Sequence, residues 1–422
     1  MTPPLLHLAS RSLRNRRVAT TLTIVSIAAS VALLLGVEIV REGARDSFTG
    51  TITGTDLIVG ARGGPLQLVL YSVFGLGSPV SNISFDTYQH FDTHPAVAWT
   101  VPISLGDSHR GYRVIATNER FFEHYRYWDD RAVELADGAV PRDVFDVAIG
   151  ADVAAALEYK VGDPVVINHG TGAADLYRHD DRPFTVTGVI APTRTPIDRG
   201  LYITLEGMTA LHVDWESGAA PRPDDATPVG ALRQLDLTPS QITSFYLGTR
   251  SRMDAFRLER EIDTYRREPI SAVIPGVALA ELWRVLGYGE AALRAVAIAV
   301  VLVGLLGMMV SLYTTLDARR RELAILRSIG AKPSTVVGLL VTEATLLATL
   351  GALTGCAAVY GLLLGLRPWI TEQTGLWLPI EPPGINTLIY LGIVILAGAI
   401  VGLIPAWRAY RATLDDGLAI RL

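Results

Sequence analysis

Four apolar stretches decide what this chain can fold into, because each is long enough to cross a lipid bilayer as a single helix. A crossing takes about 20 helical residues. The stretches cover residues 18–40, 289–316, 334–365 and 386–407. The third exceeds one crossing, so we expect it to tilt or to project beyond the lipid. The sequence therefore predicts a membrane protein with four transmembrane helices.

The first stretch has the features of an uncleaved anchor more than those of a signal peptide. Its apolar run is longer than the roughly 7–15 residues of a signal peptide, and no Ala-x-Ala cleavage site ends it. We therefore expect this helix to remain part of the protein.

Basic residues are concentrated on one side of the spans, and this bias sets the orientation of the chain. They precede the first span, fill the connection between the second and third, and follow the fourth: Arg11, Arg14, Arg16, Arg17, Arg319, Arg320, Arg321, Arg327, Lys332, Arg408, Arg411 and Arg421. The connection at 366–385 carries a single arginine. We expect segments 1–17, 317–333 and 408–422 to lie in the cytoplasm, and segments 41–288 and 366–385 outside it.

The long segment 41–288 has the pattern of a folded α/β domain. Runs rich in β-branched and aromatic residues, such as Tyr112–Ala116 and Phe184–Ile190, alternate with helical stretches such as Ala151–Leu157. Cys356, in the third span, is the only cysteine, so no disulfide can form within the chain and this domain must fold on its core alone. The predicted fold class is four transmembrane α-helices plus a large α/β extracytoplasmic domain inserted between helices 1 and 2.

Lysine is almost absent, which excludes a P-loop ATPase within these 422 residues. A Walker A loop needs Gly-Lys-Ser/Thr around the phosphates. Lys160 and Lys332, the only lysines, precede Val161 and Pro333. No serine lies in a nucleophile-elbow sequence either. We therefore predict that the chain is not an enzyme and has no catalytic residues.

Seven of the eight histidines lie in segment 41–288, which raises the question of a metal site. His90 and His94 are four residues apart and would share one face of a helix, a spacing suited to zinc. The pair lacks the glutamate of His-Glu-x-x-His, and Pro95 argues against a helix through His94. We expect exposed or hydrogen-bonded histidines and assign no metal ligand.

The connection between the second and third spans predicts a short amphipathic helix. Its apolar face consists of Leu323, Ile325, Leu326 and Ile329, and its charged face of Arg319, Arg320, Glu322 and Arg327. Gly330 is a natural C-terminal cap, and Pro333 prevents continuation. The helix is either a connector resting on lipid headgroups or a docking element for a partner.

Several motifs resemble those of one family. Arg321–Ala331, with the sequence Arg-Glu-Leu-Ala-Ile-Leu-Arg-Ser-Ile-Gly-Ala, resembles the signature of the MacB/FtsX/LolC-type ABC transporter permeases. Val341–Gly355 is similar to that family's third span, Gly402–Ala412 to its closing motif and Leu8–Arg17 to its amphipathic lead-in. One large domain between spans one and two is also that family's arrangement.

This resemblance implies a permease subunit in the bacterial inner membrane, with both termini cytoplasmic. The short cytoplasmic helix would contact a separate ABC ATPase through Arg319, Arg321, Glu322, Leu323, Ile325, Leu326, Arg327, Ile329 and Gly330. Mg-ATP would bind that ATPase, and this chain would bind no cofactor directly. The other expected partners are the lipid bilayer, a second permease copy (identical or related) and a periplasmic binding protein or lipoprotein, but no nucleic acid.

Three functions stay open at this point. The first is ATP-driven export or extraction of an unidentified substrate. The second is mechanotransmission without transport, which would regulate a periplasmic enzyme or sensor. The third is a membrane-anchored periplasmic metalloenzyme.

The outer segment resembles the family's periplasmic domain more loosely. The matching pieces are Asp146–Ala154, Val161–Asp163 and Phe184–Ile190. Residues 54–82 have no place in that pattern, so we expect a subfamily-specific function there.

Ionisable residues within the spans have two interpretations. Glu343 lies about ten residues into the third span. It either has a partner or a role inside the membrane, or reaches back to the cytoplasmic interface, and we expect the second. Glu38 and Arg294 lie near the outer ends of their spans, where a charged side chain needs no partner or role to explain it.

Overall fold

The computed structural model describes residues 3–170, 182–214, 227–318, 325, 328, 330–374 and 380–418. The chain divides into two compact units. The helical unit comprises Met1–Ala44, Leu286–Ile370 and Leu378–Leu422, and the α/β unit comprises Arg45–Val285 and Thr371–Trp377. This division agrees with the expected split between a membrane part and an α/β domain.

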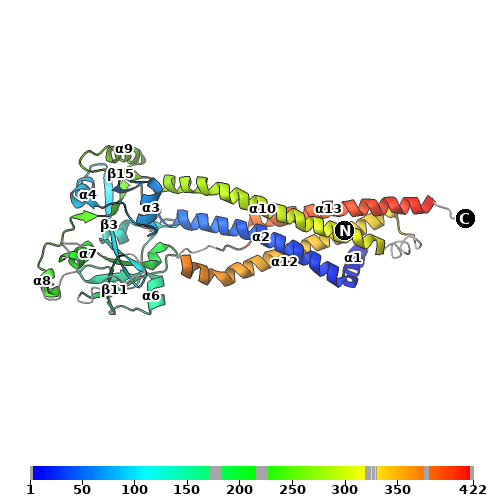
Figure 1. The fold of residues 1–422 in the computed structure, drawn as a ribbon, viewed down its shortest axis with the longest axis horizontal. Helices are drawn as coiled ribbons and strands as arrows, with labels where there is room; N and C mark the ends of the chain where they lie inside the picture. Colours follow the sequence, from blue (N-terminus) through cyan, green and yellow to red (C-terminus); the bar gives the residue numbers. More distant parts are fainter. Residues whose placement is uncertain are drawn as a thin grey trace. The chain divides into compact units, whose positions relative to one another are not determined.

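The four apolar stretches form four long helices (Figure 1). These are α2 (Arg17–Gly50), α10 (Pro275–Ala318), α12 (Pro333–Thr374) and α13 (Ile385–Leu418), and the shorter α1 (Pro3–Asn15) precedes them. Each long helix is long and apolar enough to cross a membrane. The four-span prediction is confirmed. Every helix also extends beyond its predicted apolar stretch, because polar residues continue the helical backbone at the ends.

The helical unit packs around an aliphatic core. Ile27 of α2, Met308 of α10 and Leu347 of α12 belong to one buried cluster, each no more than 2% exposed. Other faces carry large apolar side chains in the open, such as Val303 at 67% and Leu396 at 62% exposed. Soluble proteins avoid large exposed apolar patches, whereas lipid tails solvate them. The pattern suits helices whose outer faces meet lipid.

Two Gly-x-x-x-Gly pairs allow close approach between helices. The pairs are Gly351 and Gly355 on α12, and Gly398 and Gly402 on α13. A Cβ added at Gly355 would lie 2.4 Å from the carbonyl oxygen of Ala28 on α2. A Cβ added at Gly402 would lie 2.4 Å from Cβ of Ala344 on α12. Only glycine fits at such contacts, which are typical of membrane helix interfaces.

Eleven strands of the described α/β unit form one mixed sheet. Its path runs β15 (Ile270–Val273), β1 (Leu57–Ala61), β14 (Ser244–Thr249), β3 (Val97–His109), β4 (Tyr112–Thr117), β12 (Gly200–Thr204), β8 (Asp146–Ile149), β11 (Phe184–Ile190) and β7 (Leu135–Gly138). Off this path, β9 (Pro164–Val165) pairs with β11 and β10 (Asn168–His169) pairs with β3. The β4–β12 and β8–β11 pairs are parallel and the others antiparallel. Two small ribbons join β2 (Ile83–Ser84) to β13 (Gln241–Ile242) and β5 (Arg126–Tyr127) to β6 (Arg131–Ala132).

The sheet is buried on both faces. In β12, Leu201 and Ile203 enter one hydrophobic cluster, whereas Tyr202 between them enters the other. Successive side chains of a strand point to opposite faces, so this alternation places a core on each side. Two apolar faces explain why strands such as β1 and β12 are buried along their whole length.

Helices connect the strands and cover the sheet. They are α3 (Pro65–Val73), α4 (Phe85–Asp92), α5 (Arg120–His124), α6 (Ala151–Leu157), the 3₁₀ helix η1 (Pro196–Arg199), α7 (Leu205–His212), α8 (Val229–Leu232) and α9 (Arg252–Asp263). Helix α6 has the bounds expected from the sequence. Helix α4 ends at Asp92, before Pro95, as the proline predicts.

Candidate functional site

Most residues predicted to contact an ATPase lie outside the described part of the chain: Arg319, Arg321, Glu322, Leu323, Leu326, Arg327 and Ile329. Ile325 is described, and it is helical and 57% exposed. Gly330 has a φ of +95°, in the left-handed region that a C-terminal glycine cap uses. Both observations fit an amphipathic helix that ends at Gly330. Its contact with an ATPase stays a prediction.

Glu343 faces the interior of the helical unit. It lies on α12 and is 2% exposed, next to Ala344 at 0%. A glutamate that reached back to the interface would be exposed. The structure therefore favours the first interpretation of this residue, an ionisable group directed into the bundle.

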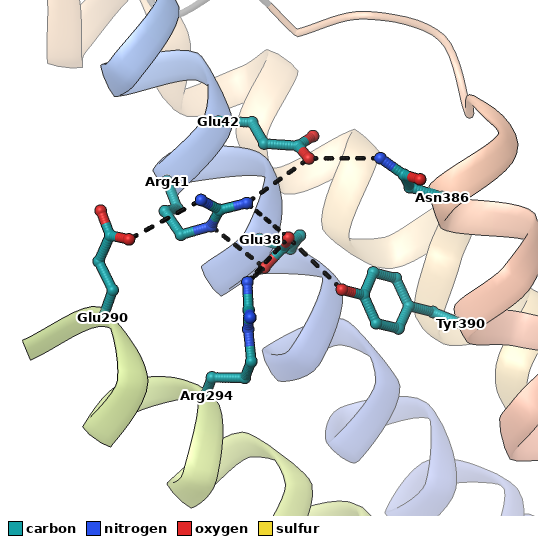
Figure 2. A network of polar contacts seen from close by, with 7 residues as sticks. All are labelled: Glu38, Arg41, Glu42, Glu290, Arg294, Asn386 and Tyr390. Carbon is teal, nitrogen blue, oxygen red and sulfur yellow. Dashed lines mark hydrogen bonds and ion pairs between the residues drawn. The ribbon is translucent and has the colours of Figure 1, made fainter. Parts of the chain in front are cut away.

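A cluster of polar residues links three long helices at Glu38 (Figure 2). Glu38 of α2 is 12% exposed and accepts two hydrogen bonds from Arg41, at 2.7 and 3.3 Å. Arg294 of α10 donates to both carboxylate oxygens, at 3.0 and 3.2 Å. The hydroxyl of Tyr390, on α13, donates at 3.4 Å. The Glu38 carboxylate thus accepts hydrogen bonds from residues of three helices.

Longer contacts surround this centre. Arg41 lies 3.6 Å from Glu42 and 3.8 Å from Glu290, and Asn386 of α13 donates to Glu42 at 3.5 Å. Charges in such a network reinforce one another where water is scarce. This cluster was not expected from the sequence, in which Glu38 and Arg294 near the outer ends of their spans needed no special account. The available signal was Glu38 and Arg41, three residues apart at one end of a span, with Arg294 near the matching end of the next span.

The α/β unit contains a pocket of about 380 Å³, within the range of small-molecule sites. Residues 71–76 form part of its wall, and they belong to segment 54–82, where we expected a subfamily-specific function. Four tyrosines also line it, each no more than 3% exposed: Tyr71, Tyr125, Tyr202 and Tyr246. Aromatic rings therefore form part of the pocket wall.

The tyrosine hydroxyls stay neutral. Three of them donate to main-chain carbonyls: Tyr125 to Thr51 at 2.8 Å, Tyr246 to Ser72 at 2.6 Å and Tyr202 to Ile197 at 3.4 Å. Burial raises the pKa of Tyr71 to about 12 and raises the pKa of Tyr125 and Tyr202 well above the usual value. The pocket walls thus present uncharged aromatic rings.

Arg113 brings a positive charge to this pocket. Its Nη2 donates to the carbonyl of Gly77 at 2.8 Å. Its Nη1 is buried and has no hydrogen-bond partner within the described residues, and burial lowers the pKa of the guanidinium. A buried donor without an acceptor is unfavourable. The pocket is suited to a molecule with an apolar or aromatic body and one acceptor group.

His90 and His94 are held by their neighbours. The ring of His90 stacks on Tyr265, with centroids 5.5 Å apart. Nδ1 of His94 accepts a hydrogen bond from the amide of Ala96 at 3.2 Å, and its Nε2 lies 3.6 Å from Glu261. These contacts agree with the expected hydrogen-bonded histidines.

A different trio comes together in the α/β unit. Asp107, His169 and His212 place one donor atom each within 4.8 Å of one another. They lie on β3, on β10 and at the end of α7, so no short spacing in the sequence could have revealed them.

Two family models match the chain. Residues 20–265 match the MacB-like periplasmic core domain, and residues 294–414 match the FtsX-like permease C-terminal region. The first match alone covers more than half of the chain.

Two curated relatives match over a shorter region. Both are macrolide export ATP-binding/permease proteins MacB, from Nitrobacter winogradskyi and Chromobacterium violaceum, and are 31% and 30% identical over 127 residues. The aligned region is 30% of this chain and 19% of each relative. The chain therefore spans about a fifth of the length of the curated relatives it matches.

Two solved structures are similar at lower identity. The periplasmic region of MacB from Actinobacillus actinomycetemcomitans is 12% identical, with 56% of this chain and 94% of that chain covered and a TM-score of 0.33. The extracellular domain of the noncanonic ABC-type transporter YknZ from Gram-positive bacteria is 10% identical, with 52% and 98% covered and a TM-score of 0.28.

Proposed function

This chain belongs to the family of MacB-like and FtsX-like ABC permeases, and we propose that it couples a separate cytoplasmic ATPase to a periplasmic domain. The observation that carries the proposal is the arrangement of its elements along the chain. An α/β unit is inserted between the first and second of four membrane helices. A basic segment with an amphipathic pattern joins the second and third.

The proposed mechanism is mechanical. The ATPase closes on Mg-ATP, and the helix within 317–333 transmits that motion to the spans. These 422 residues contain no P-loop, and a separate ATPase is the energy source in this proposal. ATP can drive such a change only if its binding favours one of two states of the complex.

The proposal includes an orientation and a second copy. Both termini and segment 317–333 lie in the cytoplasm, and segment 41–288 lies in the periplasm, as the arginine distribution indicates. Four helices enclose little space, so we expect two permease copies, identical or related. The exposed apolar faces of α10 and α13 offer surface for lipid and for such a copy.

The pocket favours cargo handling over mechanotransmission alone. A subunit that only relays force needs no cavity lined by four buried tyrosines and a buried arginine donor. We propose that cargo with an apolar body and an acceptor group contacts this pocket. Under the alternative function, amphipathic carboxylates would not change the ATPase rate of the reconstituted complex.

Site-directed cross-linking tests the proposed coupling. Cys356→Ser leaves a cysteine-free chain, and Ile325→Cys then places one thiol on the exposed position of the cytoplasmic segment. A thiol-linked photo-cross-linker at 325 is expected to capture the ATPase in membranes. The matched control is Val80→Cys, which is 66% exposed in the α/β unit and should capture none.

Labelling from outside the cell tests on which side of the membrane each position lies. A membrane-impermeant maleimide added to spheroplasts should label position 80 and spare position 325. If position 325 is labelled from outside, or captures no ATPase, the proposed coupling is wrong.

A further inference from the structure

Three side chains of the α/β unit converge on one point. Nδ1 of His169 lies 3.2 Å from Oδ1 of Asp107 and 3.1 Å from Nε2 of His212. Nε2 of His212 lies 3.6 Å from Oδ2 of Asp107. One carboxylate and two imidazole nitrogens therefore lie close enough together to bind a single metal ion.

The sheet fixes two of these residues. Asp107 and His169 are direct partners in the antiparallel ladder between β3 and β10. The third is placed by α7, which begins where the hydroxyl of Thr204 accepts a hydrogen bond from the amide of Gly207 at 3.0 Å. Groups held by strands and a capped helix keep their geometry better than groups on loops.

The His212 ring is oriented for coordination. Its Nδ1 lies 2.9 Å from the carbonyl oxygen of Met208, one turn earlier on α7, so Nδ1–H donates to that oxygen. The lone pair of Nε2 then faces Asp107 and His169. Metal-binding histidines are held in this way by a second hydrogen bond that fixes the tautomer.

The carboxylate is incompletely satisfied by protein donors. Asp107 is fully buried, and its Oδ2 has no hydrogen-bond partner within the described residues. Nε2 of His212 lies 3.6 Å from this oxygen, which is beyond hydrogen-bond distance. A buried anion with an unused oxygen calls for a compensating positive charge.

The distances suit a tetrahedral ion. Metal–ligand bonds of about 2.0–2.2 Å at tetrahedral angles separate the donor atoms by about 3.3 Å. Here the two imidazole nitrogens are 3.1 Å apart, and they lie 3.2 Å from Oδ1 and 3.6 Å from Oδ2 of the Asp107 carboxylate, respectively. Two imidazoles and one carboxylate suit zinc, whereas calcium and magnesium prefer oxygen ligands alone. The side chains of His169 and His212 are 39% and 29% exposed, which gives an ion access from solvent.

We propose that Asp107, His169 and His212 bind a zinc-type divalent transition-metal ion in the α/β unit. The ion would connect β3, β10 and α7. Asp107 and His169 are 62 residues apart in the sequence, and His169 and His212 are 43 residues apart. The chain has no disulfide to perform this task, because its only cysteine lies in α12. The metal is thus a cross-link that stabilises an extracytoplasmic domain.

The full-length chain, purified with a histidine-free tag, provides the test. After zinc loading and dialysis, we expect one zinc per chain by elemental analysis and an unfolding temperature that falls when a chelator is added. Replacing zinc with cobalt(II) should give the intense visible bands of a tetrahedral site, and added zinc should remove them. Asp107→Asn and His212→Gln should each weaken metal binding by at least about 100-fold.

His90→Ala combined with His94→Ala is the matched control, since it removes two histidines of the same unit and should leave one zinc bound. If the ligand variants do not fold, the cobalt spectrum of the unaltered chain decides. The absence of tetrahedral bands and of bound zinc in the unaltered chain would overturn the proposal, and would leave a proton-sharing cluster instead. Equal zinc binding by folded ligand variants would overturn it as well.

Discussion

Glu38 is the residue on which the contacts of three membrane helices converge. Glu38→Gln keeps the shape of the side chain but removes the charge that Arg41 and Arg294 share. We expect a lower unfolding temperature in detergent. In a double-mutant cycle with Arg294→Gln, the coupling energy should be about 1–2 kcal/mol, because Arg294 is partly solvent-screened.

Glu42→Gln is the control for this cycle. Glu42 is 45% exposed and its contacts are at 3.5 Å or longer, so its loss should change stability by less than about 0.5 kcal/mol. Coupling near zero between Glu38 and Arg294 would mean that the cluster does not hold the helices together.

Tyr71 makes the α/β unit sensitive to alkali. Burial raises its pKa to about 12 in the folded state, against about 10 when unfolded. Between these values the unfolded chain has already released the proton that the folded chain retains, so stability falls as the pH rises from 10 to 12. A shift of two units corresponds to about 3 kcal/mol.

Thermal unfolding at several alkaline pH values, with absorbance at 295 nm to follow tyrosine ionisation, measures this loss. Tyr71→Phe should reduce the slope of unfolding temperature against pH. Tyr288→Phe, at an 81% exposed position, should leave that slope unchanged. An unchanged slope in Tyr71→Phe would show that the other buried tyrosines account for the sensitivity.

Individual sites were the least predictable level of this protein. The spacing of His90 and His94 drew attention to a metal site, yet their rings contact Tyr265 and Glu261. The convergence of Asp107 and His169 depends on strand register, which the local sequence does not specify. Sites built by pairing across a sheet therefore need the fold first.

Helix packing depends on the glycine pairs 351/355 and 398/402, at which neighbouring helices approach closely. Gly355→Ala would place a methyl group against the backbone of Ala28, which cannot move aside as a side chain can. We expect a destabilisation of about 1–3 kcal/mol, as for other overpacked sites, measured by thermal unfolding in detergent.

Gly361→Ala on the same helix is the control, because no described atom lies within 4 Å of the added Cβ. It should be neutral or slightly stabilising, since alanine favours helix over glycine. Equal losses in both variants would point to backbone flexibility, and not close packing, as the role of Gly355.

Most helices and strands followed from local patterns. Long apolar runs identified the four membrane helices because a bilayer demands about 20 apolar residues. Runs such as Phe184–Ile190 identified strands through their β-branched and aromatic content. The order of strands in the sheet did not follow, because pairing between distant strands leaves no local signature. The Gly-x-x-x-Gly spacing was visible in the sequence and went unused.

At the scale of the whole molecule, segment 317–333 is proposed to join this permease to its ATPase. The family supplies the expectation, and the exposed Ile325 and the left-handed Gly330 are consistent with it. The apolar residues Leu323 and Leu326 are among those expected to contact the partner, so charges introduced there should break the contact.

Co-purification of the permease with its ATPase tests this proposed contact. The unaltered chain should retain the ATPase, and Leu323→Asp combined with Leu326→Asp should lose it while still inserting and folding. Ser328→Asp combined with Ser334→Asp adds the same two charges at exposed polar positions and should retain it. If the unaltered chain retains no ATPase under gentle extraction, or the Leu323 and Leu326 double variant retains it fully, the account of this chain as a coupling permease is contradicted.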